Sequence, residues 1–155
     1  MKVEKLKAYH LSLLDYDKGM KWPSINRVYD DFNRRKTEEI IEKYRDISKI
    51  LISRSTSLFI CSTLQNVELW GIKKFKMKNP YLYTLELTGE LYWVDANHYE
   101  KVFDCFDKGC GDIKICKENA INYWKEVNPN EGYPILAEGL FRGSALIVDK
   151  KLYPI

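Results

Sequence analysis

An alternating segment from Tyr81 to Leu91 constrains the fold of this chain more than any other feature. Its apolar side chains are Tyr83, Leu85, Leu87 and Leu91, and its polar ones include Thr84, Glu86, Thr88 and Glu90. Side chains point to opposite faces of a β-strand with a period of two, so this alternation predicts a half-buried strand. We therefore expect a sheet that buries one of its faces.

Four other segments have the composition of strands. They run from Leu6 to Leu14, from Ser57 to Cys61, from Tyr133 to Phe141 and from Ser144 to Val148, and the last two meet at Arg142-Gly143. The first ends at a polar stretch that contains Gly19, and the third follows the turn cluster Asn128 to Gly132. These segments and the alternating one predict five strands.

Helical spacing of apolar residues separates the predicted strands. Between Ser24 and Leu51 we expect a short helix capped by Ser24 with Val28, Tyr29 and Phe32, and a second helix opened by Thr37-Glu38-Glu39 with Ile40, Ile41, Tyr44, Ile47 and Leu51. The capping-box pattern Ser62 to Gln65 predicts a third helix that ends near Gly71 to Lys74. Two more follow, one with Tyr99, Val102, Phe103 and Phe106 up to the break at Gly109-Cys110-Gly111, and one marked by Ala120, Tyr123 and Trp124.

The order of these elements indicates the fold class. Helices and strands mix without the regular alternation of a doubly wound sheet, so we predict an α+β protein. Its sheet is expected to be mixed or antiparallel, with helices packed at its faces. A length of 155 residues fits one domain, and we expect residues 1–155 to form it.

Composition excludes several classes of protein. With 45% hydrophobic and 30% charged residues the chain is neither disordered nor membrane-spanning. A net charge of +3 is too small for a dedicated nucleic-acid binder, although the basic clusters Asn33 to Lys36 and Lys73 to Lys78 can meet phosphate. The cysteines Cys61, Cys105, Cys110 and Cys116 lack C-x-x-C spacing, and no signal-peptide pattern is present. We expect reduced thiols, no metal and a cytoplasmic location.

Few residues carry recognisable chemistry, because no phosphate-binding loop, nucleophile elbow, kinase signature or zinc helix is present. His10 and His98 are candidates, although each can equally be a structural histidine. Glu138 stands among apolar residues, so its carboxylate must face solvent, a partner or a pocket. Asp95 is a candidate acid or only the N-cap of the helix that follows it.

The order of several segments resembles a known family. They are Tyr9-His10 in the first strand, Leu58-Phe59-Ile60-Cys61 before a helix with Trp70-Gly71, and the strand from Tyr81 to Leu91 followed by Asp95. This order is similar to the small bacterial rifamycin ADP-ribosyltransferases, which carry Tyr-His-Gly, then Ile-Tyr-Phe-Ser before a helix with Trp-Gly, then a strand before an acidic cluster. The chain departs from that pattern at Leu11, which replaces Gly, and at Phe59, which replaces Tyr. The resemblance is that of a distant relative.

The broader ADP-ribosyltransferase superfamily contains two classes. One is built on Arg, Ser-Thr-Ser and Glu-x-Glu, and Ser55-Thr56-Ser57 and Cys61-Ser62-Thr63 mimic its middle element. The first strand, however, offers His10 in place of Arg, and Leu136-Ala137-Glu138 lacks the first acid. The chain therefore looks like the histidine class, with Glu138 at the position of that class's single late acid.

The resemblance implies an NAD-dependent transferase that cleaves the bond between nicotinamide and ribose. Glu138 would stabilise the positive charge of the transition state, with Asp95 as second choice or as a group that positions the acceptor. His10 would bind a ribose or adenosine hydroxyl, so His10 and Glu138 must line one cleft. Candidates to pack on the nicotinamide are Tyr9, Phe59 and Trp93. The acceptor is open between a protein, a nucleic acid, a small molecule and water, and no membrane partner is expected.

Two other functions stay open. A noncatalytic protein of the same fold would bind a nucleotide or a protein partner. A mildly basic module would bind single-stranded nucleic acid through Arg34, Arg35, Lys73, Lys74 and Lys76 with aromatic side chains. Steep salt dependence of oligonucleotide binding would identify the second alternative.

Overall fold

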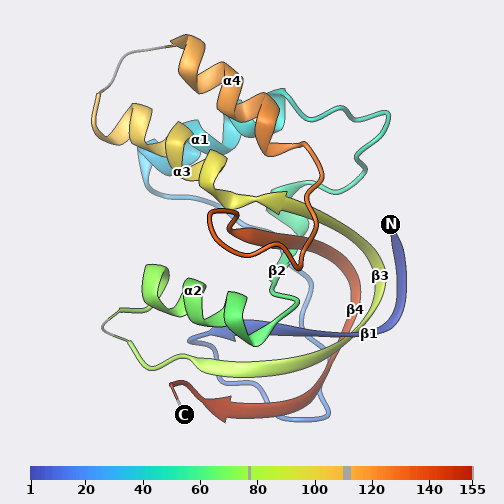
Figure 1. The fold of residues 1–155 in the computed structure, drawn as a ribbon. Helices are drawn as coiled ribbons and strands as arrows, with labels where there is room; N and C mark the ends of the chain where they lie inside the picture. Colours follow the sequence, from blue (N-terminus) through green and yellow to red (C-terminus); the bar gives the residue numbers. More distant parts are fainter. Residues whose placement is uncertain (77, 110–112, 155) are drawn as a thin grey trace.

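The computed structural model describes residues 1–76, 78–109 and 113–154 and has the predicted α+β architecture (Figure 1). Its strands are β1 (Lys2–Ser12), β2 (Leu58–Ile60), β3 (Tyr81–Asp95) and β4 (Ala137–Leu152). They form one open antiparallel sheet in the order β1-β3-β4-β2. The helices are α1 (Phe32–Lys43), α2 (Leu64–Lys74), α3 (Ala96–Asp107) and α4 (Ile113–Tyr123), with a short 3₁₀ turn η1 (Arg54–Thr56) before β2.

The alternating segment forms the first part of β3, as predicted, and the strand continues to Asp95. Its apolar side chains Tyr83, Leu85, Leu87 and Leu91 are all fully buried in the core. Both β3 and β4 bend strongly (Figure 1), and Gly89 of β3 pairs with Gly143 of β4. Each glycine has a positive φ, 156° and 145°, and a Cβ on either would collide with the backbone of the opposite strand. The two strands can therefore approach this closely only with glycine at both positions.

The curved sheet brings its two end strands together. Tyr9 of β1 and Cys61, just after β2, form a bridge in which each backbone N–H donates to the other's carbonyl over 2.8 Å. These strands lie at opposite ends of the sheet order, so only the curvature of β3 and β4 makes this contact possible. The bridge places the end of β1 beside β2.

The predicted strands at the C-terminal end are wrong in their boundaries. Residues 133–136 are not part of a strand and contain a turn at Tyr133 and Pro134, and the two segments expected to meet at Arg142-Gly143 are one continuous strand, β4. Gly143 allows the strand to bend there without losing its pairing with β3, so a bend replaces the expected break.

The helix predictions after Ser24 need a similar correction. No helix begins at Ser24, because α1 starts at Phe32, where the Asp31 side chain caps it by accepting a hydrogen bond from the Arg34 N–H over 2.8 Å. Thr37 therefore lies inside α1 and does not open a second helix. After α1 the Asp46 carboxylate accepts two bonds from Ser48 in a turn, and the expected apolar stripe ends with Ile47 and Leu51 exposed.

The remaining helix predictions are confirmed. Thr63 caps α2 by accepting from the Asn66 N–H, and Asp95 caps α3. The helix marked by Ala120 and Tyr123 is α4. Helix α3 ends at Asp107, and positions 110 and 111 of the expected glycine break lie outside the described residues.

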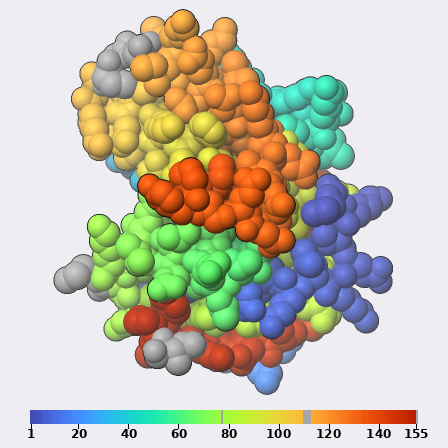
Figure 2. Space-filling model, in the orientation of Figure 1, coloured from blue at the N-terminus to red at the C-terminus, as the bar shows by residue number. Residues whose placement is uncertain are grey.

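The helices divide into two groups that frame the site. Helices α1, α3 and α4 pack together, whereas α2 stands apart from them against β1 (Figure 1). The segment 125–136 crosses from α4 to β4 and lies on α2, where the Ser62 hydroxyl donates to the Pro129 carbonyl over 3.1 Å (Figure 2). In the three described stretches, no helix combines the length and apolar character needed to cross a membrane.

Candidate active site

A small pocket lies where β1, β2, β4 and α2 meet. Its volume is about 120 Å³, and its lining residues are His10, Leu11, Phe59, Ile60, Cys61, Trp70, Lys74, Phe75 and Glu138. Three of the predicted site residues, His10, Phe59 and Glu138, are among them. Small-molecule sites usually measure about 300–1,000 Å³, so this pocket can enclose only one ring-sized part of a large ligand.

Strand pairing brings these side chains together. The Tyr9 to Cys61 bridge sets His10 beside β2. On the other edge of β2, Ile60 pairs with Gly139 of β4, next to Glu138. A Cβ at position 139 would come within 2.6 Å of the Ile60 side chain, so the glycine permits this close approach.

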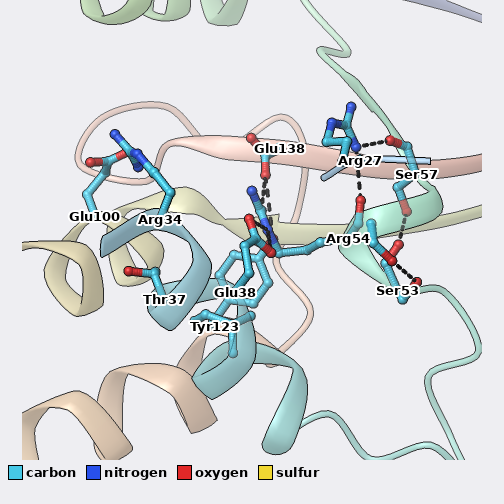
Figure 3. Close-up of polar contacts among 12 residues, drawn as sticks. Arg27, Arg34, Thr37, Glu38, Ser53, Arg54, Ser57, Glu100, Tyr123 and Glu138 are labelled. Carbon is cyan, nitrogen blue, oxygen red and sulfur yellow. Dashed lines mark hydrogen bonds and ion pairs between the residues drawn. The ribbon is translucent and has the colours of Figure 1, made fainter. Parts of the chain in front are cut away.

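Glu138 is held by one of its two carboxylate oxygens. Its Oε1 accepts a hydrogen bond from Arg54 Nη1 over 2.8 Å and lies 3.5 Å from the Tyr123 hydroxyl. The second oxygen points away from Arg54 (Figure 3). In the described part of the chain no group donates a hydrogen bond to this second oxygen. Every fully buried side-chain oxygen or nitrogen among the described residues does have a hydrogen-bond partner. The second oxygen is therefore not completely buried, and the residue lines the pocket.

Arg54 is shared between two carboxylates. Besides Glu138, its Nε donates to both oxygens of Glu38 over 3.0 and 3.1 Å. The guanidinium is almost excluded from solvent and also lies over the Phe59 ring, 4.5 Å from its centroid. The charge of Arg27 also interacts with Glu38 and Glu138, so two guanidinium groups and two carboxylates lie together beside the pocket.

Arg27 completes the polar framework. Its Nη1 donates to the carbonyls of Arg54 and Ser57, which fixes η1 against the irregular segment before α1 (Figure 3). Its guanidinium lies 3.8 Å from the centroid of the Phe59 ring. Phe59 is therefore already in contact with two cations, from Arg27 and Arg54.

His10 presents a hydrogen-bond acceptor. Its Nδ1 lies 2.5 Å from the Phe59 carbonyl oxygen, and because a carbonyl only accepts, Nδ1 must carry the proton. Burial lowers the pKa of His10 to about 4; the Phe59 carbonyl raises it, and the charges of Arg27 and Lys74 lower it. The ring is thus neutral at pH 7, and within the described residues no hydrogen bond reaches Nε2. A ligand hydroxyl can donate to this nitrogen.

Cys61 is the one thiol in the pocket lining. Burial raises its pKa far above the usual value, with a further contribution from Glu138. It is therefore protonated at neutral pH and is a poor nucleophile.

Three predicted residues lie elsewhere. Tyr9 lines a separate groove with Lys5 and Lys7, because side chains alternate along β1 and His10 takes the opposite face. Trp93 is 3% exposed in the core. Asp95 caps α3, and its Oδ1 accepts from the N–H groups of Asn97 and Leu136 over 3.0 and 3.2 Å.

His98 and the cysteines do not form a metal centre in the described structure. The Nδ1 of His98 lies 2.9 Å from the Asn119 side-chain oxygen, so this histidine has a structural partner. Cys61 and Cys116 are buried free thiols, Cys105 is also buried, and Cys110 lies outside the described residues. Over residues 1–76, 78–109 and 113–154, no group of three or more His, Cys, Asp or Glu side chains can hold a metal ion.

Sequence reasoning did not place Arg54, Lys74, Trp70 or Tyr123 beside Glu138, although Lys74 was a candidate nucleic-acid contact and Trp70 was part of the family resemblance. Their role depends on long-range contacts, such as that between Arg54 and Glu138, 84 positions apart. The one local signal was an arginine inside the serine-rich stretch that leads into β2.

Comparison with known proteins gives a family without an assigned activity. No curated protein matches the sequence. A family model described as "Protein of unknown function (DUF2441)" matches residues 4–152, which include every residue of the pocket. The chain therefore belongs to the DUF2441 family.

Proposed function

We propose that this protein binds NAD and transfers its ADP-ribose unit to an acceptor, releasing nicotinamide. The observation that carries the proposal is that His10, Phe59 and Glu138 line one pocket although they come from three separate strands. In the resemblance to the histidine class of ADP-ribosyltransferases, His10 and Glu138 match the family's histidine and late acid, and Phe59 stands where the family has a tyrosine.

Glu138 supplies the carboxylate in the proposed reaction. When the bond between the nicotinamide nitrogen and the ribose carbon breaks, both electrons leave with nicotinamide and positive charge develops on the ribose. A carboxylate fixed beside that carbon stabilises the charge without having to reorient. Arg54 holds one oxygen of Glu138, which leaves the other for the ribose. The acceptor then bonds to the ribose carbon and loses its proton to this carboxylate or to solvent.

His10 orients the substrate in this proposal. Its unprotonated Nε2 accepts a hydrogen bond from a ribose hydroxyl, and its Nδ1–H bond to the Phe59 carbonyl fixes the ring. The edge of the Trp22 ring packs against His10 with centroids 4.8 Å apart, which restricts the imidazole further. Such positioning accelerates a reaction by reducing the entropy lost at the transition state.

Phe59 serves as a wall of the pocket. A cationic nicotinamide ring favours an aromatic face, but two guanidinium groups already lie within 4.5 Å of the Phe59 centroid. A third cation on this ring would be repelled, so we assign Phe59 to excluding water and supporting His10 through its carbonyl.

Labelled NAD tests the proposal. The protein is incubated with NAD labelled in the adenylate phosphate, with and without cell extract, and free nicotinamide and labelled products are measured. We expect wild-type protein and the control Glu126→Gln, at an exposed carboxylate, to release nicotinamide, and Glu138→Gln to release far less. NAD binding without any release would favour the noncatalytic alternative. Absence of both binding and release would overturn the proposal.

A further inference from the structure

Lys74 brings a positive charge to the same pocket. It is the last residue of α2 and stands in the lining with His10 and Glu138. Among the described lining residues it is the one cationic side chain, since His10 is neutral at pH 7. The pocket therefore has a negative group on β4 and a positive group on α2.

The helix that carries Lys74 is fixed to the strand that carries Glu138. The Trp70 indole N–H donates to the Ala137 carbonyl over 3.2 Å, and the Asn66 side-chain amide donates to the same oxygen over 2.5 Å. The Lys74 ammonium lies over the Trp70 ring, 4.7 Å from its centroid. The separation of the two charges is thus set by buried hydrogen bonds rather than by a flexible loop.

The ammonium of Lys74 is available to a ligand. Lys74 is exposed as a residue, although partial burial of its ammonium lowers its pKa, and within the described parts of the chain it forms no ion pair, not even with Glu138. Arg34, by contrast, is paired with Glu100 and covers the Phe103 ring. An accessible cation at the edge of a pocket attracts anions, and the phosphates are the anionic groups of a dinucleotide.

We propose that Lys74 binds a phosphate group of the dinucleotide substrate and so determines the direction in which the substrate enters the pocket. This inference rests on the proposed function. The nicotinamide end of NAD is cationic and its pyrophosphate is anionic. With nicotinamide and its ribose at Glu138 and the pyrophosphate at Lys74, both ends meet opposite charges. The reversed orientation would place like charges together at both ends.

The size of the pocket agrees with this orientation. A volume of about 120 Å³ encloses one ring-sized group and leaves the pyrophosphate outside. Exposed Lys74 is where that outer part would emerge. The phosphate contact is consequently open to water and is expected to weaken as salt is added.

A series of shortened ligands tests the role of Lys74. Dissociation constants are measured by calorimetry for NAD, nicotinamide mononucleotide and nicotinamide riboside, which differ in their phosphates. The proteins are wild type, Lys74→Gln and the control Lys73→Gln, which removes a neighbouring exposed lysine of the same helical turn that does not line the pocket. We expect Lys74→Gln to weaken NAD and the mononucleotide by about tenfold at low salt and to leave the riboside unchanged.

The outcomes separate this inference from the proposed function. If wild type binds NAD and Lys74→Gln weakens all three ligands equally, or behaves like Lys73→Gln, Lys74 does not bind phosphate and the inference is wrong. If wild type binds none of the three ligands, the proposed function fails and the inference with it. Equal melting temperatures of the three proteins check that each variant is folded.

Discussion

Arg54 holds Glu138 through a single 2.8 Å hydrogen bond, from Nη1 to Oε1, while its Nε bonds to Glu38. The side chains of Arg54 and Glu138 are only 6% and 4% exposed. A buried carboxylate without a partner is strongly unfavourable, so this ion pair explains why an acid is tolerated among the apolar residues of β4. It also holds the carboxylate in one orientation, with the second oxygen pointing away from Arg54 (Figure 3), and Glu138 lines the pocket.

Replacing Glu138 by glutamine tests the catalytic role of that second oxygen. The amide oxygen can still accept from Arg54, so the fold should be retained, but the negative charge is lost. We expect turnover to fall by roughly 10² to 10³ with NAD affinity nearly unchanged, because the charge acts mainly on the transition state. Steady-state nicotinamide release and calorimetry measure the two effects. Full activity of Glu138→Gln would remove Glu138 from the reaction.

Arg54→Met should destabilise the whole protein. The substitution leaves the buried Glu138 and the partly buried Glu38 without their shared cation, and the loss of one partner from a buried ion pair costs roughly 3–5 kcal/mol. Urea unfolding measures the free energy of unfolding directly. The control Arg35→Met alters an exposed arginine of α1 and should change stability by no more than about 0.5 kcal/mol. Equal stability of both variants would show that the ion pair contributes little.

His10 is best tested by substitutions that separate its two nitrogens. In His10→Asn the amide N–H can replace Nδ1–H toward the Phe59 carbonyl, but the acceptor at Nε2 is lost. We expect NAD binding to weaken by up to about tenfold, the cost of one hydrogen bond, with a small change in melting temperature. His10→Gln reaches the position of Nε2 and loses the Phe59 bond, so it should lower the melting temperature more and NAD affinity less. The reverse pattern would contradict this assignment.

Asp95 should prove to be structural. It caps α3 and also accepts from the Leu136 N–H, so Asp95→Ala is expected to lower the free energy of unfolding by about 1–2 kcal/mol. Asp95→Asn keeps an oxygen that can cap the helix and should cost much less. Neither variant should reduce turnover at a temperature where both are folded. If Asp95→Asn abolished nicotinamide release while Glu138→Gln did not, Asp95 would be the reacting acid.

Local patterns predicted the elements that local interactions create. The alternation from Tyr83 to Leu91 predicted β3, and the side chains of Thr63 and Asp95 cap α2 and α3 near the predicted positions. The boundaries of β4 were predicted wrongly because a glycine in a strand can mark a break or a bend. Gly143 marks a bend only because Gly89 faces it on β3, which no local pattern reveals.

The site was predictable only in part, because it too depends on contacts between segments that are far apart in the sequence. His10, Phe59 and Glu138 were chosen by resemblance, and they meet because β1 and β2 are bridged at Tyr9 and Cys61. Nothing in the sequence near Arg54 or Lys74 indicates this closure, so neither was predicted to act with Glu138. Conversely, Trp93 was expected in the pocket because it is aromatic, but it fills the core beneath Gly139.

His10 also makes stability depend on pH in a defined direction. Burial lowers its pKa in the folded protein to about 4, whereas an unfolded histidine has a pKa near 6.5. Between these values the unfolded chain binds one more proton than the folded protein, so this contribution to stability is complete above pH 6.5 and is lost as the pH falls toward 4. The slope is at most about 1.4 kcal/mol per pH unit.

Urea unfolding of wild type and His10→Asn from pH 7 to pH 4 isolates the contribution of His10 to stability, since the carboxylates are common to both proteins. We expect wild type to lose stability relative to His10→Asn on acidification, and parallel curves would show that His10 is protonated as readily in the folded as in the unfolded chain.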